Sequence, residues 1–454
     1  MSSHGEPNNS DRNEKKVASG KTSPASLSRE TSSSAALSQS HSEDARHEET
    51  SAKTQAILNA CIRGDIPALG DLAVSEGGFL SDDLRRHAWP ILLGCPSDSD
   101  SVQLNGTIPV TRDGEDGKIS EKSDVEVRPW RELPRHRDED QVRLDVDRSF
   151  IYYPNNASQA DLDTKKTELS DLITETLRRY PFLCYFQGYH DICQVLLLVL
   201  SPEQRPAAMA RLSALRIRDF MLPNLAPAVA QLRLIPDILG AADPALCAHL
   251  SQTEPFFALS GTLTMYAHDI QSYGAIARLF DALLAREPVF GVYMFARIVL
   301  DRRAELFDTP ANEPEMLHSI LSKLPQPLRL EELIRGTDEL FAAHPPESLR
   351  AWRPRISPAS VLKTARDARA AAAQSMRDGE RYFEAQLREL QWAERKEQLA
   401  RTVWGYAAAA RQRARSPLAR GLVVAVLVSV AAVYLRKAQP GLLAYITSFW
   451  SRRG

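Results

Sequence analysis

The chain carries two short motifs, Asp145-Val-Asp-Arg148-Ser149 and Tyr185-Phe-Gln187-Gly188-Tyr-His190-Asp191. Gln187 follows Arg148 by 39 positions (187 − 148). Asp145 precedes Arg148 by three residues, so a helix would place both on one face, where the carboxylate restrains the guanidinium. Gly188 leaves no side chain directly after Gln187, as is needed where a backbone passes close to another surface. Arg148 and Gln187 are the long polar side chains at the centre of these two motifs.

Both motifs, in this order, resemble the TBC domain of Rab GTPase-activating proteins. The first matches the family pattern I-x-x-D-x-x-R-T, with Val142 at the apolar position and Ser149 in place of the final threonine. The run 185–191 is similar to the tail-anchored branch of the family. The resemblance implies that Arg148 and Gln187 are the catalytic arginine and glutamine fingers. It implies supporting roles for Asp145, Tyr185, Gly188, His190 and Asp191.

The chemistry of GTP hydrolysis explains why these two residue types are needed. Phosphoryl transfer to water is catalysed mostly by positioning the water and stabilising charge on the transferred group. A guanidinium is always charged, and its planar fork of donors suits phosphate oxygens. A glutamine amide both donates and accepts, so it can hold the attacking water in place of the Rab's own glutamine. Under this resemblance the partner Rab binds GTP and Mg²⁺, and we expect no cofactor or metal on this chain.

Two further runs fall in the order of the family. Leu84 to Gly94 resembles the opening signature of the TBC domain, in which we expect Trp89 to be a core residue and Arg85 a buried or half-buried ion-pair partner that helps to hold the finger region. Arg278-Leu-Phe-Asp281 resembles the R-L-W-D helix of the family. Apolar residues recur around it at helical spacing, which predicts a core stripe rather than a ligand site: Ile276, Leu279, Phe280, Leu283 and Leu284.

One position departs from the family pattern. Gly261 aligns with a position that is usually tryptophan. Glycine inside a helix costs about 1 kcal/mol relative to alanine, and the missing ring would weaken local packing. We expect neighbouring side chains to fill this space, so the fold is retained.

Charge, cysteine spacing and the lack of a phosphate loop at Gly117 argue against nucleic-acid binding, metal binding and nucleotide binding by this chain. The 454 residues carry a net charge of −2, which gives no electrostatic case for nucleic-acid binding. The five cysteines form neither C-x-x-C pairs nor a metal-ligand spacing, as is usual in a reducing, cytosol-facing compartment. Gly117-Lys118-Ile-Ser120 is not a phosphate loop, because Arg112 stands where that motif requires glycine.

The sequence divides into segments of different character. Residues 1–50 are rich in serine and lack aromatic residues, which predicts a disordered tail. Residues 51–350 show successive helical stripes, which predict an all-α TBC domain interrupted by a polar insertion at about 96–124. Residues 351–417 are dominated by strong helix formers and predict a juxtamembrane helical stalk.

The carboxyl end predicts a membrane anchor at 418–437. Gly421 to Leu435 is a mostly apolar run of 15 residues without charge, flanked by Arg420 and Arg436. It is short for a bilayer core, but snorkelling of the flanking arginines would extend it, and the thinner endoplasmic-reticulum membrane suits a short span. With no signal peptide at the N-terminus, the TBC domain would face the cytosol. Residues 438–454 would form either a short luminal tail or a second membrane arm.

These features predict a GTPase activator of an early-secretory, ER-to-Golgi Rab, placed on the endoplasmic-reticulum or early Golgi membrane. The chain would stimulate the hydrolysis of the Rab and not be a hydrolase itself. A second hypothesis stays open at this point, in which the chain is a membrane-anchored adaptor or tether that binds a Rab without accelerating hydrolysis. The presence of both finger residues favours the activator.

Overall fold

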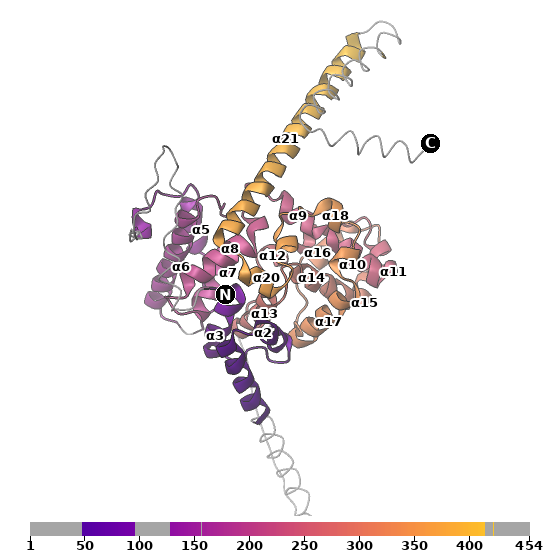
Figure 1. Cartoon of the computed structure of the whole chain (residues 1–454). Coiled ribbons are helices and arrows are strands. Elements are labelled where there is room, and N and C mark those ends of the chain that lie inside the picture. The colour runs from indigo at the N-terminus through magenta and orange to yellow at the C-terminus, as the bar shows by residue number, and fades with distance from the viewer. Residues whose placement is uncertain (1–47, 96–127, 156, 414–420, 422–454) are drawn as a thin grey trace, which may run out of the picture. The chain divides into compact units, whose positions relative to one another are not determined.

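The computed structural model describes residues 48–95, 128–155, 157–413 and 421 (Figure 1). The chain separates into two units, Met1–Lys53 and Thr54–Gly454, and the account below concerns the second. The predicted insertion, the membrane anchor except Gly421, the segment 438–454 and most of the N-terminal tail lie outside the described residues. Within the described ranges, every regular element is a helix, which confirms the all-α class for that part of the chain. No helix there is long and apolar enough to cross a bilayer.

A helix that ends at residue 63 comes first. The α-helices after it are α2 (Ile66–Val74), α3 (Asp82–Leu93), α5 (Glu139–Val146), α6 (Gln159–Arg179), α7 (Tyr189–Val199), α8 (Arg205–Leu215), α9 (Ala226–Leu232), α10 (Leu234–Ala242), α11 (Pro244–His249), α12 (Leu259–Leu263), α13 (Tyr273–Ala285), α14 (Phe290–Asp301), α15 (Arg303–Phe307), α16 (Pro314–Leu321), α17 (Leu330–Ala343), α18 (Trp352–Arg355), α19 (Val361–Thr364), α20 (Ala368–Ala373) and α21 (Met376–Arg413). Short 3₁₀ turns are η1 (Trp130–Glu132), η2 (Arg218–Phe220), η3 (Pro255–Ala258) and η4 (Pro346–Ser348).

Local sequence signals set where several helices begin and end. Ser81 caps α3 by accepting a hydrogen bond from the Leu84 amide, and Gly94 ends the same helix in the left-handed conformation. Ser158 and Asp161 form a capping box at the start of α6. The Ser81 and Ser158 caps satisfy amide groups that the first helical turn leaves without partners, and the Gly94 amide donates to the Ile91 carbonyl in the last turn of α3.

Helix α13 is a central packing element of the domain. It packs against α2 and α3, against α7 and against α17, and α5 and α6 pack beside α7 and α8 (Figure 1). The apolar stripe expected around Arg278 lies on α13 and is buried, which confirms it as core. Two of the helical stripes predicted within residues 51–350 are α6 and α7, and the core faces of both helices are buried.

The space beside Gly261 is filled as expected. A methyl group built on Gly261 would lie 3.2 Å from Cε1 of Tyr266 and 3.3 Å from Cε2 of Phe295. The rings of Tyr266 and Phe295 are stacked, with centroids 6.4 Å apart. These two aromatic side chains therefore fill the space beside Gly261.

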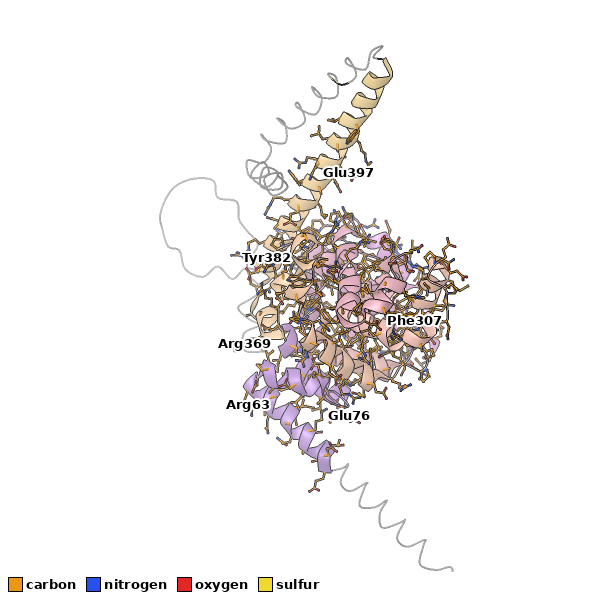
Figure 2. All side chains as sticks on the ribbon, turned by 90° about the vertical axis from the view of Figure 1, so that its right-hand side faces the viewer. Arg63, Glu76, Phe307, Arg369, Tyr382 and Glu397 are labelled. Carbon is orange, nitrogen blue, oxygen red and sulfur yellow. The ribbon has the colours of Figure 1, made fainter. Side chains whose placement is uncertain are left out.

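The packed core continues past residue 350, where the sequence predicted the stalk to begin. Trp352 and Phe383 are buried, and in α21 side-chain exposure becomes general only from about residue 391. Figure 2 labels both parts of α21, with Tyr382 in the packed segment and Glu397 in the exposed one. The packed part of the structure therefore extends beyond residue 350 into α21. Sparse apolar residues among strong helix formers do not reveal which of them are covered.

A buried polar cluster fastens the start of α21 to the domain. Asp219 accepts hydrogen bonds from Gln386 Nε2 at 2.8 Å and from the Val361 amide at 3.0 Å. Arg218, which is fully buried, donates through Nε to Gln386 Oε1 at 3.0 Å. Buried charged side chains such as Arg218 and Asp219 require hydrogen-bond partners. Gln386 of α21 supplies one to each, so the first turns of α21 are part of the domain.

Candidate functional site

Arg148 lies in the turn that follows α5. Its backbone amide donates to the Asp145 carbonyl at 3.1 Å, so the chain is still turning as it leaves the helix. The side chain is 62 % exposed, and its Nη2 donates to Asp145 Oδ1 at 2.5 Å. The pairing expected from the spacing of three residues is present, although Arg148 stands two residues beyond the end of α5.

The carboxylate of Asp145 is fully buried and has donors on both oxygens. Oδ1 accepts from Gln141 Nε2 at 3.0 Å as well as from Arg148, and Oδ2 accepts from the Tyr185 hydroxyl at 2.9 Å. Ionised carboxylates are rarely buried without such partners. Asp145 therefore acts as a fixed anchor under a guanidinium that solvent can reach.

Gln187 is exposed at the entrance of α7, and Gly188 is the N-cap of that helix. The backbone of Gly188 has φ of 100°, and an added Cβ would lie 2.6 Å from Cγ2 of Thr264. Both the conformation and the close approach require glycine. The close contact predicted after Gln187 is therefore real, and its other surface is Thr264.

A chain of polar contacts runs from Asp145 through the second motif. The single proton of the Tyr185 hydroxyl goes to Asp145, so its oxygen accepts from His190 Nδ1, 3.2 Å away. This assigns the proton of His190 to Nδ1. Burial lowers the pKa of His190, against the opposing effect of Asp191. Burial raises the pKa of Tyr185 far above its usual range, which keeps its hydroxyl a donor.

The chain of contacts ends on a residue that sequence reasoning missed. His268, between α12 and α13, places Nδ1 3.0 Å from Asp191 Oδ2, across 77 positions of sequence. The hydrogen bond to Asp191 raises the pKa of His268. Asp191 also lies 3.4 Å from His190 Nε2 through its other oxygen. No local motif marks His268, because its partner Asp191 lies on α7, far away in the sequence.

Helix α5 and the start of α7 are joined at three levels. The amide of Tyr185 donates to Asp138 Oδ2 at 2.9 Å, just before α5, and its hydroxyl reaches Asp145 near the end of the helix. Beyond α5, the Phe150 amide donates to Gln194 Oε1 at 2.9 Å. The structure therefore brings Arg148 and Gln187 onto two elements that are fixed to each other.

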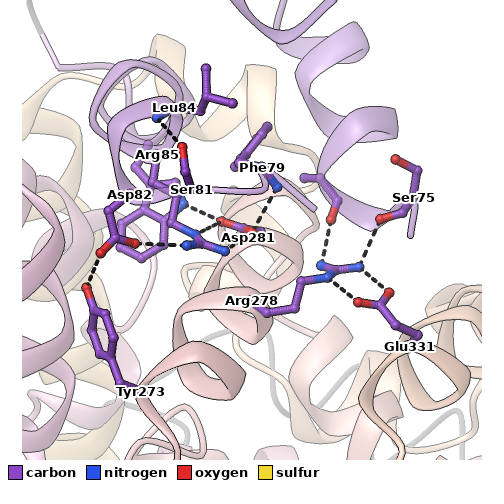
Figure 3. Close-up of polar contacts among 12 residues, drawn as sticks. Ser75, Phe79, Ser81, Asp82, Leu84, Arg85, Tyr273, Arg278, Asp281 and Glu331 are labelled. Carbon is purple, nitrogen blue, oxygen red and sulfur yellow. Dashed lines mark hydrogen bonds and ion pairs between the residues drawn. The ribbon is translucent and has the colours of Figure 1, made fainter. Parts of the chain in front are cut away.

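Arg85, the remaining predicted site residue, belongs to a different cluster. Its Nε and Nη2 donate to the two oxygens of the fully buried Asp281 at 3.0 and 3.1 Å, and its Nη1 donates to Asp82 at 2.8 Å (Figure 3). Trp89 also donates to Asp281, at 2.9 Å. Arg85 and Trp89 thus join α3 to α13 in the core, as ion-pair partner and core residue. The contacts of Arg85 are in this cluster and not with the finger residues.

Comparison of the sequence with known proteins identifies the family of this chain. The family model described as Rab-GTPase-TBC domain matches residues 82–307. The GTPase-activating protein gyp10 of Schizosaccharomyces pombe is 33% identical over 336 residues, which cover 73% of this chain and 83% of that protein. This chain belongs to the TBC domain family. Arg85, Arg148 and Gln187 all fall within the matched TBC residues.

Other TBC proteins are similar over shorter stretches. Human TBC1 domain family member 20 is 33% identical over 287 residues, covering 63% of this chain and 65% of that protein. The GTPase-activating protein GYP8 of Saccharomyces cerevisiae is 27% identical over 242 residues, covering 48% of this chain and 43% of that protein. The TBC match ends at Phe307, so α16 to α21 extend the fold beyond it.

Proposed function

We propose that this protein accelerates GTP hydrolysis on an early-secretory, ER-to-Golgi Rab by supplying Arg148 and Gln187 in trans. The observation that carries the proposal is the setting of Arg148. Its guanidinium is 62 % exposed, yet it is bonded to a carboxylate that is wholly buried and held by two further donors. An ordinary surface arginine, whose charge is solvated by water, would not need a buried carboxylate to hold it.

The anchor prepares the arginine for a partner. A free arginine side chain loses considerable rotamer entropy when it is fixed, and a guanidinium that is already oriented loses less on binding. When the Rab covers the site, water leaves and the attraction between the guanidinium and the phosphate oxygens becomes stronger. Arg148 then stabilises charge that develops on the transferred phosphoryl group.

Gln187 serves the water side of the reaction. Its amide is exposed at the start of α7, and the residues beneath it fix the backbone through Gly188 and the Tyr185 contacts. The amide can accept a hydrogen bond from the attacking water and donate one toward the nucleotide. Arg148 thus stabilises charge in the transition state, and Gln187 positions the attacking water.

We also propose that the protein works at the endoplasmic-reticulum or early Golgi membrane, held by the anchor at 418–437. The support is the uncharged apolar run from Gly421 to Leu435 in the sequence. A Rab confined to the same surface would meet the TBC domain at a raised effective concentration. The domain would face the cytosol.

The test is single-turnover GTP hydrolysis by a panel of purified Rabs with the full-length protein in mild detergent. Strong acceleration on one early-secretory Rab supports the proposal and names the substrate. If a folded protein binds a Rab but accelerates none, the proposal is wrong and the adaptor or tether hypothesis takes its place.

A further inference from the structure

The surface beside Arg148 carries apolar side chains that the fold leaves uncovered. Leu144 is 60 %, Ile151 72 % and Tyr152 47 % exposed. We infer that these three residues, here called the finger-side patch, bind an apolar surface of the Rab next to its nucleotide site. The inference rests on the proposed function and adds the residues that set affinity for the substrate.

Simple geometry places the patch inside the interface. Consecutive Cα atoms are about 3.8 Å apart, so Ile151 lies within roughly 11 Å of Arg148 and Tyr152 within roughly 15 Å. A standard interface buries about 800 Å² on each partner, equal to a disc of roughly 16 Å radius. An interface of this size centred on Arg148 therefore reaches the positions of the patch.

The turn that presents Ile151 and Tyr152 is held by buried aromatic side chains on both sides. Phe150 is buried and has φ of 62°, a left-handed conformation that is costly for a residue with a side chain. It is retained because its ring is buried and its amide donates to Gln194 Oε1 at 2.9 Å. Tyr153 is buried again, against Tyr273 at 5.8 Å between ring centroids. Two buried aromatic residues thus bracket the two exposed ones.

Such a turn suits recognition because the exposed side chains lose little backbone freedom on binding. Gln194 lies on α7, whose N-cap Gly188 directly follows Gln187, so the turn is bonded to the helix that the second finger residue precedes. One charged neighbour, Arg143, already pairs with Asp140 at 2.9 Å. Large apolar side chains at the centre of an interface are what dominates affinity in such settings.

Other exposed apolar residues lack this position and serve as controls. The ring of Phe307 is covered by Arg303, whose Cζ lies 4.6 Å from the ring centroid. Phe307 is also far from the finger motifs in sequence. Ile62 is 83 % and Met316 53 % exposed, and both lie on other helices. The pair Ile62 and Met316 matches the pair Ile151 and Tyr152 in number and exposure.

The experiment measures kcat and KM of the full-length protein on the Rab from the purified panel that the wild type accelerates most. We expect Ile151→Ser/Tyr152→Ser to raise KM at least tenfold with kcat kept, and Leu144→Ser to raise KM several-fold. The control Ile62→Ser/Met316→Ser should keep both constants. A KM within twofold of wild type for all patch variants overturns the inference.

The failure of this inference is distinguishable from failure of the proposed function. If Arg148→Ala abolishes acceleration while the patch variants keep KM, the function stands and the patch is not part of the interface. If Arg148→Ala has no effect, both are wrong. Should the double variant melt at a lower temperature than wild type, Leu144→Ser, which lies outside the strained turn, decides the question.

Discussion

The Tyr185 hydroxyl donates a hydrogen bond of 2.9 Å to the buried carboxylate of Asp145, 40 positions earlier in the chain. This bond joins the arginine motif to the glutamine motif below the surface. Asp145 in turn holds Arg148, so the orientation of the guanidinium depends on a residue of the other motif.

Replacing Tyr185 with phenylalanine should weaken both stability and activity. Asp145 would lose one donor while staying buried, which costs about 1 to 3 kcal/mol of unfolding free energy. We expect the variant to unfold at lower urea concentration and to show a reduced kcat on the Rab. Unchanged unfolding and unchanged kcat would mean that this bond does not hold the finger.

Gly188→Ala should be strongly destabilising. The new methyl group would lie 2.6 Å from Thr264, and φ of 100° is unfavourable for alanine. We expect a loss of about 1 to 3 kcal/mol, measured by urea unfolding.

The matched control for that substitution is Gly274→Ala. Gly274 lies in α13, and a methyl group there meets no atom within 4 Å. This variant should be neutral or gain up to about 1 kcal/mol, since alanine favours a helix. Equal effects at positions 188 and 274 would contradict the close approach to Thr264.

His268 should give the stability a pH dependence. Its hydrogen bond to Asp191 raises its pKa in the folded protein, so the stabilisation is complete below the unfolded value of about 6.5. It is lost as the pH rises through the raised folded pKa. We therefore expect wild type to exceed His268→Gln in urea stability at about pH 6, with the gap closing by about pH 9. A gap that is constant across this range would contradict the pairing.

Truncation at residue 350 should leave an unfolded or aggregating fragment. It would remove Trp352 and Phe383, which are buried, and each large-to-small loss of this kind costs about 3 to 5 kcal/mol. Truncation at residue 405 keeps these residues, and that fragment should melt cooperatively. A cooperative melt of the shorter fragment, followed by circular dichroism, would mean that the α18–α21 segment is dispensable.

Local spacing was enough to predict much of the site. Asp145 and Arg148 are three residues apart, and apolar residues recur at helical spacing along α6 and α13, so these features follow from the chain itself. His268 could not be found in this way, because its contact with Asp191 depends on tertiary packing. The left-handed turn at Phe150 is likewise imposed by burial and by Gln194. The sparse apolar positions of α21 gave no sign that Phe383 is covered.

The central claim is that Arg148 acts on the transition state and not on binding. The measurement is single-turnover GTP hydrolysis and Rab affinity for wild type and Arg148→Ala, with the Rab that the wild type accelerates most. The account predicts a loss of about 10³-fold or more in the rate, with Rab affinity changed only a few-fold. A rate within tenfold of wild type for Arg148→Ala would contradict it.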